Sequence, residues 1–187
     1  AAGSWQRIAD NNPISSSRGV SWTYHSDHLY GAYGNLLQSL NVSTGQWEAL
    51  PPLSTGRSRA TLCVLDGRLF VVGGSTAGGC TASVEEYRAV EHRWVPVPDM
   101  PRAVQDARAV ALDGKLLVIG GKWDNFIYDA SEPTCTVYEY DPGDGSWKKL
   151  PSLLAERFYA AVTVLGGDVV VIGEGRGIVV RYGASVQ

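Results

Sequence analysis

Residues 66–74 read Asp-Gly-Arg-Leu-Phe-Val-Val-Gly-Gly, and residues 113–121 read Asp-Gly-Lys-Leu-Leu-Val-Ile-Gly-Gly. Each stretch joins a turn dipeptide to a short apolar run that ends in two glycines. An Asp-Gly pair between apolar runs is a strong hairpin signal, because glycine adopts the positive φ of a primed two-residue turn. Both stretches therefore predict β-hairpins, and their likeness indicates an internal repeat.

The repeat extends in both directions along the chain. Weaker copies of the same stretch lie at residues 26–34 and 166–174. Similar segments begin with a tryptophan, at Trp5, Trp47, Trp94 and Trp147. Seven residues before the tryptophan position stands a leucine or tyrosine, at Leu40, Tyr87, Tyr140 and Tyr182. No window has a useful 3.6-residue apolar period, so each unit predicts four short strands and the chain predicts an all-β fold.

These units closely resemble the kelch repeat over almost the whole chain, through Gly183. The first copy departs from the pattern at Tyr33-Gly34 and the last at Gly173-Glu174. The resemblance implies a kelch-type β-propeller of four-stranded antiparallel blades, with the first strand of each blade nearest the axis. We expect one domain over residues 1–187, with blades at about residues 18–50, 57–97, 102–150 and 157–183.

Small residues before the turns support this placement of the first strands, because inner strands converge; they are Val20, Ala60, Ala107 and Ala160. The last unit has only three predicted strands, at residues 158–165, 169–173 and 178–182. Residues 5–8 form a spare fourth strand, which we expect to complete the last blade and close a ring of four blades. A fragment of a larger propeller and a head-to-tail assembly, in which the spare strand serves a neighbouring copy, remain alternatives.

Unit lengths differ almost entirely between the second and third strands, and insertions confined to one loop type mark one face, often the binding face. The loops that lead into each first strand open on the same face and are rich in arginine. Guanidinium groups bind carboxylates and phosphates bidentately. The predicted partner-binding residues are Arg18, Arg57, Arg59, Arg102, Arg108, Lys122, Trp123, Asn125, Phe126, Arg157, Tyr159 and Arg176. Among them Arg57, Arg59, Arg102 and Arg157 are the expected anion contacts.

Structural roles are open for several of these residues. The arginines could instead brace the blades through loop carboxylates, such as Asp99, Asp106 or Glu156, and Arg108 could point into the central channel. Trp123 and Phe126 could pin a long loop.

Composition and charge argue against some classes of function. The chain has 187 residues with 16 Lys and Arg against 19 Asp and Glu, so it lacks the basic excess of a nucleic-acid-binding protein. No apolar stretch approaches the ~20 residues of a membrane-spanning helix. Three cysteines suit a reducing cytoplasmic or nuclear location. Cys63 is expected in the core; Cys80 and Cys135 are expected to be inert, with pairing or oxidant sensing as alternatives.

We expect a binding module for a peptide or protein that is acidic or ends in a carboxylate. The resemblance implies substrate recognition for a cullin-RING ubiquitin ligase, with the cullin adaptor bound through a BTB or BC-box segment outside this chain. A structural role, actin-associated or in dimerisation, is an alternative that needs a patch on a blade side. An enzyme is not expected, and neither is a metal or cofactor, because His25, His28 and His92 do not form the ligand sets of galactose-oxidase-like or specifier propellers.

Overall fold

The computed structural model describes residues 4, 6–14, 19–125, 130–173 and 180–182. These residues form strands and turns, so the predicted all-β fold is confirmed. Within these ranges no helix reaches the length and apolar character needed to cross a membrane.

Four antiparallel sheets follow one another along the chain. The first contains β1 (Ser21–His25), β2 (His28–Tyr33), β3 (Leu36–Asn41) and β4 (Trp47–Leu50). The second contains β5 (Thr61–Leu65), β6 (Arg68–Val72), β9 (Val84–Arg88) and β10 (Arg93–Val97). The third contains β11 (Arg108–Leu112), β12 (Lys115–Ile119), β15 (Val137–Asp141) and β16 (Ser146–Leu150). The fourth contains β17 (Ala161–Leu165), β18 (Asp168–Ile172) and β19 (Val180–Tyr182).

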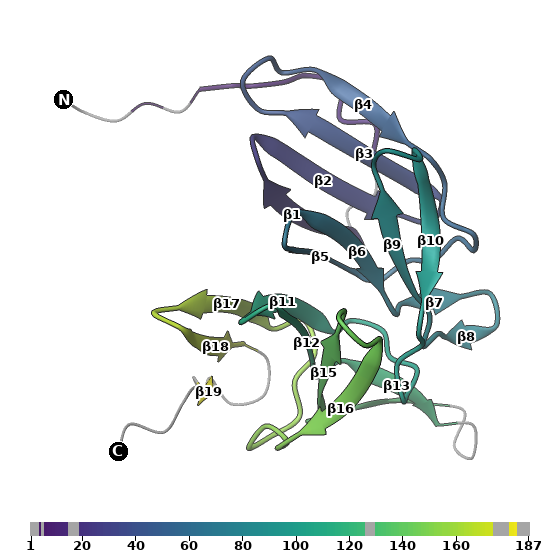
Figure 1. Ribbon diagram of the computed structural model, residues 1–187, viewed down its shortest axis with the longest axis vertical. Helices are drawn as coiled ribbons and strands as arrows, with labels where there is room; N and C mark the ends of the chain where they lie inside the picture. Colours follow the sequence, from purple (N-terminus) through teal and green to yellow (C-terminus); the bar gives the residue numbers. More distant parts are fainter. Residues whose placement is uncertain (1–3, 5, 15–18, 126–129, 174–179, 183–187) are drawn as a thin grey trace.

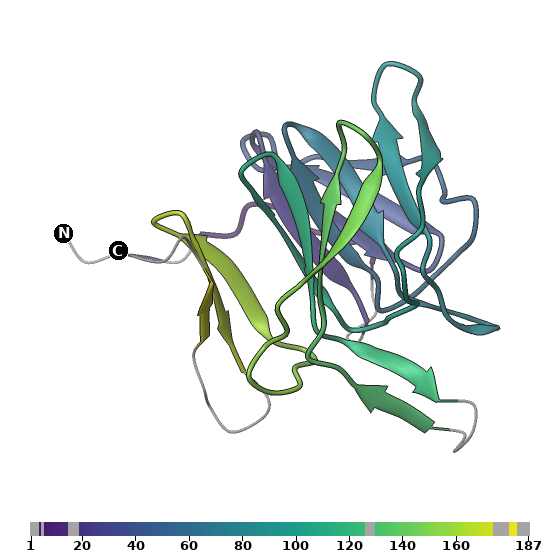
Figure 2. The same cartoon turned by 60° about the horizontal axis from the view of Figure 1, so that its bottom comes forward.

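The two insertions form small hairpins between the second and third strands of their sheets. They consist of β7 (Ser75–Thr76) with β8 (Gly79–Cys80) and of β13 (Lys122–Asn125) with β14 (Ala130–Pro133). Both hairpins extend from the same end of the molecule (Figure 2). We call this end the loop face.

The turns between the first two strands have the predicted geometry. Both central residues have positive φ, at Asp66 (49°) and Gly67 (74°), and again at Asp113 (50°) and Gly114 (70°). This is the backbone of a type I′ turn, whose twist matches that of the strands it joins.

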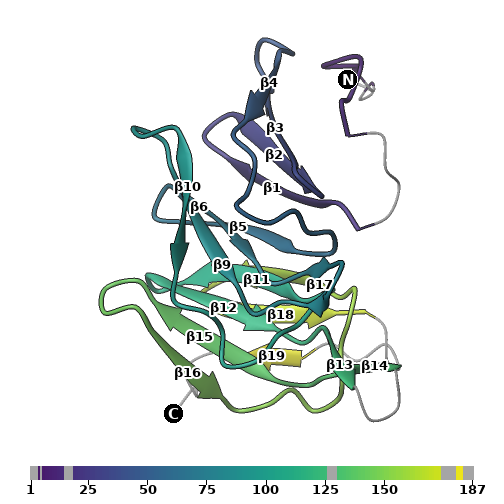
Figure 3. The ribbon, with the colours of Figure 1, turned by 90° about the vertical axis from the view of Figure 1, so that its right-hand side faces the viewer.

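The first strands of the sheets lie next to one another at the centre, with β5 in contact with β1 and β11, and β11 in contact with β17. The sheets therefore fan out around a common axis as the blades of a propeller (Figures 1 and 3). Each of the three apolar clusters lies between two neighbouring blades. Phe70 of blade 2 and Tyr140 of blade 3, for example, pack with ring centroids 6.3 Å apart. Cys63 is buried in this cluster, as predicted.

The repeat tryptophans connect each blade to the segment that precedes it. The indole N–H of Trp94 donates to the carbonyl of Pro51 at 2.9 Å, and that of Trp147 donates to Pro98 at 2.8 Å. The indole N–H of Trp47 likewise donates to the carbonyl of Asp10 at 3.1 Å, and this hydrogen bond holds the N-terminal segment against blade 1. Residues 6–8 form no strand, and β19 pairs only with β18 among the described residues. Residues 6–8 therefore do not form the predicted pairing with the last blade, and Trp5 lies outside the described residues.

The blades form an open arc rather than the closed ring of four that we expected (Figure 1). Side chains alternate along a strand, so Trp22 and Tyr24 face away from blade 2, and Leu165 and Ile172 face away from blade 3. These side chains are 37%, 62%, 69% and 47% exposed. Both alternatives to the closed ring predict that these apolar faces are covered in the complete assembly.

Candidate functional site

Four residues in equivalent positions, each just before an inner strand, surround the loop-face end of the central channel. We call them the mouth residues; they are Gly19, Arg59, Asp106 and Tyr159. All have left-handed φ, of 73°, 57°, 57° and 52°. Their backbone N–H groups form a chain, from Arg59 to the carbonyl of Gly19 (3.0 Å), from Asp106 to Arg59 (3.0 Å) and from Tyr159 to Asp106 (3.3 Å). Such backbone costs a non-glycine residue about 1–2 kcal/mol and often marks functional sites.

A cavity of about 440 Å³ opens among the mouth residues, and Val20, Ala60 and Arg108 complete its lining. A second cavity, of about 550 Å³, lies between the inner strands β1, β5, β11 and β17. Val20 and Arg108 line both. Arg108 therefore lies where the mouth meets the channel, which supports the alternative that it points into the channel.

Asp106 places a carboxylate among the cations of the mouth. Its side chain is 2% exposed, and Nη1 of Arg59 lies 4.0 Å from its Oδ2. Burial raises the pKa of Asp106, while a hydrogen bond from Tyr159 opposes the shift. The charges of Arg59, Lys122 and Arg108 also lower this pKa. Two cations, Arg59 and Arg108, line the mouth together with this carboxylate, so the mouth is net positive when Asp106 is ionised.

Hydrogen bonds connect Arg59 to both insertion hairpins. Nη1 of Arg59 donates to Oε1 of Gln105 at 3.2 Å, and Nε2 of Gln105 donates to the hydroxyl of Ser131 at 3.1 Å. Ser131 donates to Oδ1 of Asp124 at 2.9 Å, and Oδ2 of Asp124 accepts the backbone N–H of Cys80 at 2.5 Å. The insertions therefore hold the guanidinium of Arg59 beside the mouth.

Two cations stack on aromatic rings of the loop face. Nζ of Lys122 lies 3.8 Å from the ring centroid of Phe158 and 5.5 Å from that of Tyr159. The guanidinium of Arg102 lies 3.8 Å from the ring centroid of Trp123. Trp123 also packs against the apolar cluster between blades 2 and 3. This packing supports the alternative that Trp123 pins its hairpin.

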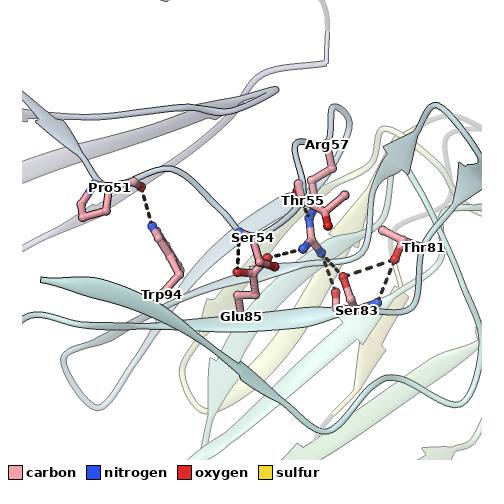
Figure 4. A network of polar contacts seen from close by, with 8 residues as sticks. All are labelled: Pro51, Ser54, Thr55, Arg57, Thr81, Ser83, Glu85 and Trp94. Atoms are coloured by element: carbon pink, nitrogen blue, oxygen red, sulfur yellow. Dashed lines mark hydrogen bonds and ion pairs between the residues drawn. The ribbon is translucent and has the colours of Figure 1, made fainter. Parts of the chain in front are cut away.

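Arg57 lies inside blade 2 rather than on the loop face (Figure 4). Its guanidinium pairs with Glu85, and the two side chains are 1% and 2% exposed. It also donates to the carbonyls of Ser83 (2.9 Å) and Thr55 (3.3 Å), while Glu85 accepts the N–H of Ser54 at 3.0 Å. The predicted contact between Arg57 and a partner is therefore incompatible with this structure, and the bracing alternative describes this residue.

Arg157 is also buried, at 1% exposure, so its predicted partner contact needs the same correction. Its Nη1 donates to the carbonyl of Glu156 at 2.8 Å, but Nε and Nη2 form no hydrogen bond with any described residue. The remaining predicted contacts lie outside the described part of the chain; they are Arg18, Phe126, Arg176 and the side chain of Asn125.

The cysteines and histidines form no further site in the described ranges. Cys63, Cys80 and Cys135 are free thiols. Burial raises the pKa of Cys63 and of Cys80 to about 12, which opposes the thiolate that oxidant sensing by Cys80 would need. No three His, Cys, Asp or Glu residues of the described ranges are grouped so that they could hold a metal ion.

Sequence reasoning missed the role of Asp106 and Gln105 at the mouth. Asp106 was expected only as a bracing carboxylate, and Gln105 gave no signal. The alignment of the four repeats does contain a signal for the mouth. The position just before the small residue at the start of each inner strand differs in chemical type from copy to copy: it is Gly19, Arg59, Asp106 and Tyr159. The position that follows keeps a small residue in every copy, at Val20, Ala60, Ala107 and Ala160.

Comparison with known proteins gives consistent matches. The model of the Kelch motif matches residues 56–101 and 105–154. Kelch repeat and BTB domain-containing protein 2 of Ectromelia virus (strain Moscow) is 27% identical over an alignment of 149 residues, and the match covers 74% of this chain and 27% of that protein. Kelch-like protein terF of Aspergillus terreus is 26% identical over 147 residues, 74% of this chain and 32% of that protein. Kelch-like protein 33 of Homo sapiens is 36% identical over 75 residues, 39% of this chain and 14% of that protein.

The solved structure of YjhT superposes with a TM-score of 0.76 at 18% identity, and the match covers 89% of this chain and 59% of that chain. The fold and the equivalent positions of the four mouth residues define a β-propeller repeat protein. The two motif matches cover half of the sequence, and the chain belongs to the kelch repeat family. It spans about a third or less of the length of these curated relatives.

Proposed function

We propose that this chain is a protein-interaction module that binds an acidic or carboxylate-ended peptide segment at the mouth of the loop face. The observation that carries the proposal is the cavity of about 440 Å³, into which three blades contribute Arg59, Arg108 and Tyr159. Cations and aromatic side chains that converge on a concave site are typical of binding hot spots. The side chain of Arg59 is 46% exposed, so its guanidinium can reach a ligand in solvent.

A finer proposal is that the bound segment belongs to a substrate of a cullin-RING ubiquitin ligase. Its support is the kelch family itself and relatives named as kelch repeat and BTB domain-containing proteins. The adaptor contact would then be made by a segment outside this chain. Co-purification of a cullin with the full-length protein tests this role separately from peptide binding.

Replacing Arg59 or Lys122 with alanine is expected to weaken binding of an acidic peptide by about 2 kcal/mol, near thirtyfold, because each variant removes a charge from the anion site. A fluorescein-labelled glutamate hexapeptide titrated at low and moderate salt provides the measurement. Arg93→Ala and Lys148→Ala are the matched controls, since both residues are exposed on outer strands. Equal losses in the controls would reduce the effect to net charge and contradict a localised site.

Gln105→Ala is expected to weaken binding of the same peptide about threefold to fivefold, because Arg59 loses the acceptor that orients it. In the Arg59→Ala background the second change should cost almost nothing, since the two residues act as a unit. Gln38→Ala, at a buried glutamine in β3, is the control for packing loss. Additive losses from Gln105 and Arg59 would refute the orienting role.

The exposed apolar faces of blades 1 and 4 favour one second candidate, a scaffold that assembles through its blade sides. Trp22 and Ile172 are on these faces. Light scattering tests this candidate, since a self-assembling scaffold has a solution mass that is a multiple of 20.1 kDa, and a monomer would contradict it.

A further inference from the structure

Side-chain hydroxyls join the inner strands of blades 1, 2 and 3. The hydroxyl of Ser21 in β1 accepts the backbone N–H of Leu62 in β5 at 2.8 Å. The hydroxyl of Thr61 in β5 accepts the backbone N–H of Ala109 in β11 at 3.2 Å. The two hydrogen bonds occupy equivalent positions of the repeat, so they are two copies of one contact between neighbouring blades.

This contact cannot form between blades 3 and 4. The equivalent side chain in β11 is Arg108, which offers only hydrogen-bond donors. The equivalent N–H in β17 belongs to Val162, whose register with the next strand is that of Leu62 and Ala109. The backbone hydrogen bonds of the mouth residues also repeat from blade to blade, and β11 contacts β17. The N–H of Val162 is therefore directed toward the side chain of Arg108, which cannot accept it.

Both donors are accessible from the channel. Arg108 and Val162 are half-buried and line the cavity of about 550 Å³. Nη1 of Arg108 donates to the carbonyl of Ala107 at 3.2 Å, while the other guanidinium nitrogens have no partner among the described residues and are not buried. Arg108 is the one charged residue in the described lining of this cavity. A cation beside a backbone N–H, with no carboxylate in the lining, favours an anionic ligand.

We propose that a carboxylate of the bound peptide passes through the mouth and binds between the guanidinium of Arg108 and the backbone N–H of Val162. This inference rests on the proposed function and deepens it, because it names the two donors that hold the anionic group. The carboxylate belongs to an acidic side chain or to the C-terminus of the peptide, which share this chemistry. A position that breaks the stabilising pattern of the other copies is typical of a functional site.

The test compares Arg108→Thr with Arg108→Val. Both variants remove the guanidinium and should bind the labelled glutamate hexapeptide about thirtyfold more weakly than the wild-type chain. Only threonine restores the acceptor that Thr61 provides between blades 2 and 3. Arg108→Thr should therefore melt about 2–4 °C higher than Arg108→Val.

Two controls separate these effects from general ones. Arg93→Ala removes a charge from an exposed position on an outer strand and should leave binding nearly unchanged. Thr163→Val makes the same exchange of hydroxyl for methyl at an exposed position of β17, and its melting temperature measures the intrinsic difference between the two residues.

The source of the carboxylate is distinguished by amidating the C-terminus of the hexapeptide. Weaker binding of the amidated peptide to the wild-type chain assigns the carboxylate to the C-terminus, and unchanged binding assigns it to a glutamate side chain. In either case Arg108→Thr should remove the advantage of that carboxylate.

Two results overturn this inference alone. One is binding that survives in Arg108→Thr while Arg59→Ala still weakens it. The other is a difference in melting temperature between Arg108→Thr and Arg108→Val that is no larger than the difference at Thr163, because the N–H of Val162 would then not be directed at position 108. Failure of the peptide to bind the wild-type chain overturns the proposed function and this inference with it.

Discussion

Replacing Glu85 with alanine is expected to lower the free energy of unfolding by about 3–5 kcal/mol, because it leaves the guanidinium of Arg57 buried without its counter-charge. Both side chains are almost fully buried, and Glu85 also accepts the backbone N–H of Ser54. Burial lowers the pKa of Arg57 and Glu85 raises it, so the pair opposes a real desolvation cost. Denaturant unfolding followed by tryptophan fluorescence measures the change.

Blade 3 suggests a double variant that should compensate for the loss of the buried ion pair. At the positions equivalent to Arg57 and Glu85 it carries Val104 and Tyr138, which are 2% and 8% exposed. The double variant Arg57→Val with Glu85→Tyr should therefore recover much of the stability that Glu85→Ala loses.

A surface pair provides the control for the same blade. Glu91→Ala breaks the exposed pair with Arg93 and should cost less than about 1 kcal/mol. If Glu85→Ala and Glu91→Ala destabilise the chain equally, the buried pair is not a brace. Peptide binding measured on folded Glu85→Ala protein should be unchanged, which separates Arg57 from Arg59.

The hairpins, the blades and the end of the molecule that carries the insertions could be predicted from sequence because their signals are local. Asp66-Gly67 sets its own turn, and the Gly-Gly pairs and tryptophans recur at regular distances. The kelch resemblance then supplied the arrangement of the blades. Local chemistry and repeat order together were enough for the fold class.

The roles of individual arginines could not be predicted in the same way. Arg57 and Arg59 are two residues apart in one loop and look alike in the sequence. Their environments differ because Glu85, which is far along the chain, pairs with Arg57 inside blade 2. Among the described residues, the side chain of Arg59 has only the neutral Gln105 within hydrogen-bond range. Burial of an arginine thus depends on a partner from a distant strand, which no local pattern specifies. The placement of residues 6–10 is likewise set by a non-local contact, from Trp47 to Asp10.

Gly121→Ala is expected to lower the free energy of unfolding by about 2–5 kcal/mol, because the added Cβ meets both backbone strain and a close neighbour. Gly121 has φ of 97°, and a Cβ there would lie 2.6 Å from the carbonyl oxygen of Gln105 and 3.0 Å from Cβ of Ala107. The carbonyl of Gln105 also accepts the N–H of Lys122 at 2.7 Å, so it cannot move away from the new Cβ without breaking this hydrogen bond.

The control is Gly114→Ala, where φ is 70° but a Cβ would meet no atom within 4 Å. This variant carries only the conformational cost, about 1–2 kcal/mol, so the difference between the two isolates the close approach to Gln105. Gly74→Ala should behave like Gly121→Ala, because its Cβ would lie 2.7 Å from the carbonyl oxygen of Ser58. Chemical denaturation measures all three variants, and equal losses at Gly114 and Gly121 would show that the close approach is not what requires glycine.

The same substitution should also affect the mouth. A displaced Gln105 no longer orients Arg59, so folded Gly121→Ala protein should bind the glutamate hexapeptide more weakly, while Gly114→Ala protein binds it normally. Gly74 contacts Ser58 and Ala60, which flank Arg59, so folded Gly74→Ala protein should also bind the peptide more weakly. Normal binding by folded Gly121→Ala protein would contradict the coupling between Gly121 and the mouth. The second glycine of the Gly-Gly pair thus admits the segment that leads into the inner strand of its own blade, and in blade 3 that segment carries Gln105 and Asp106.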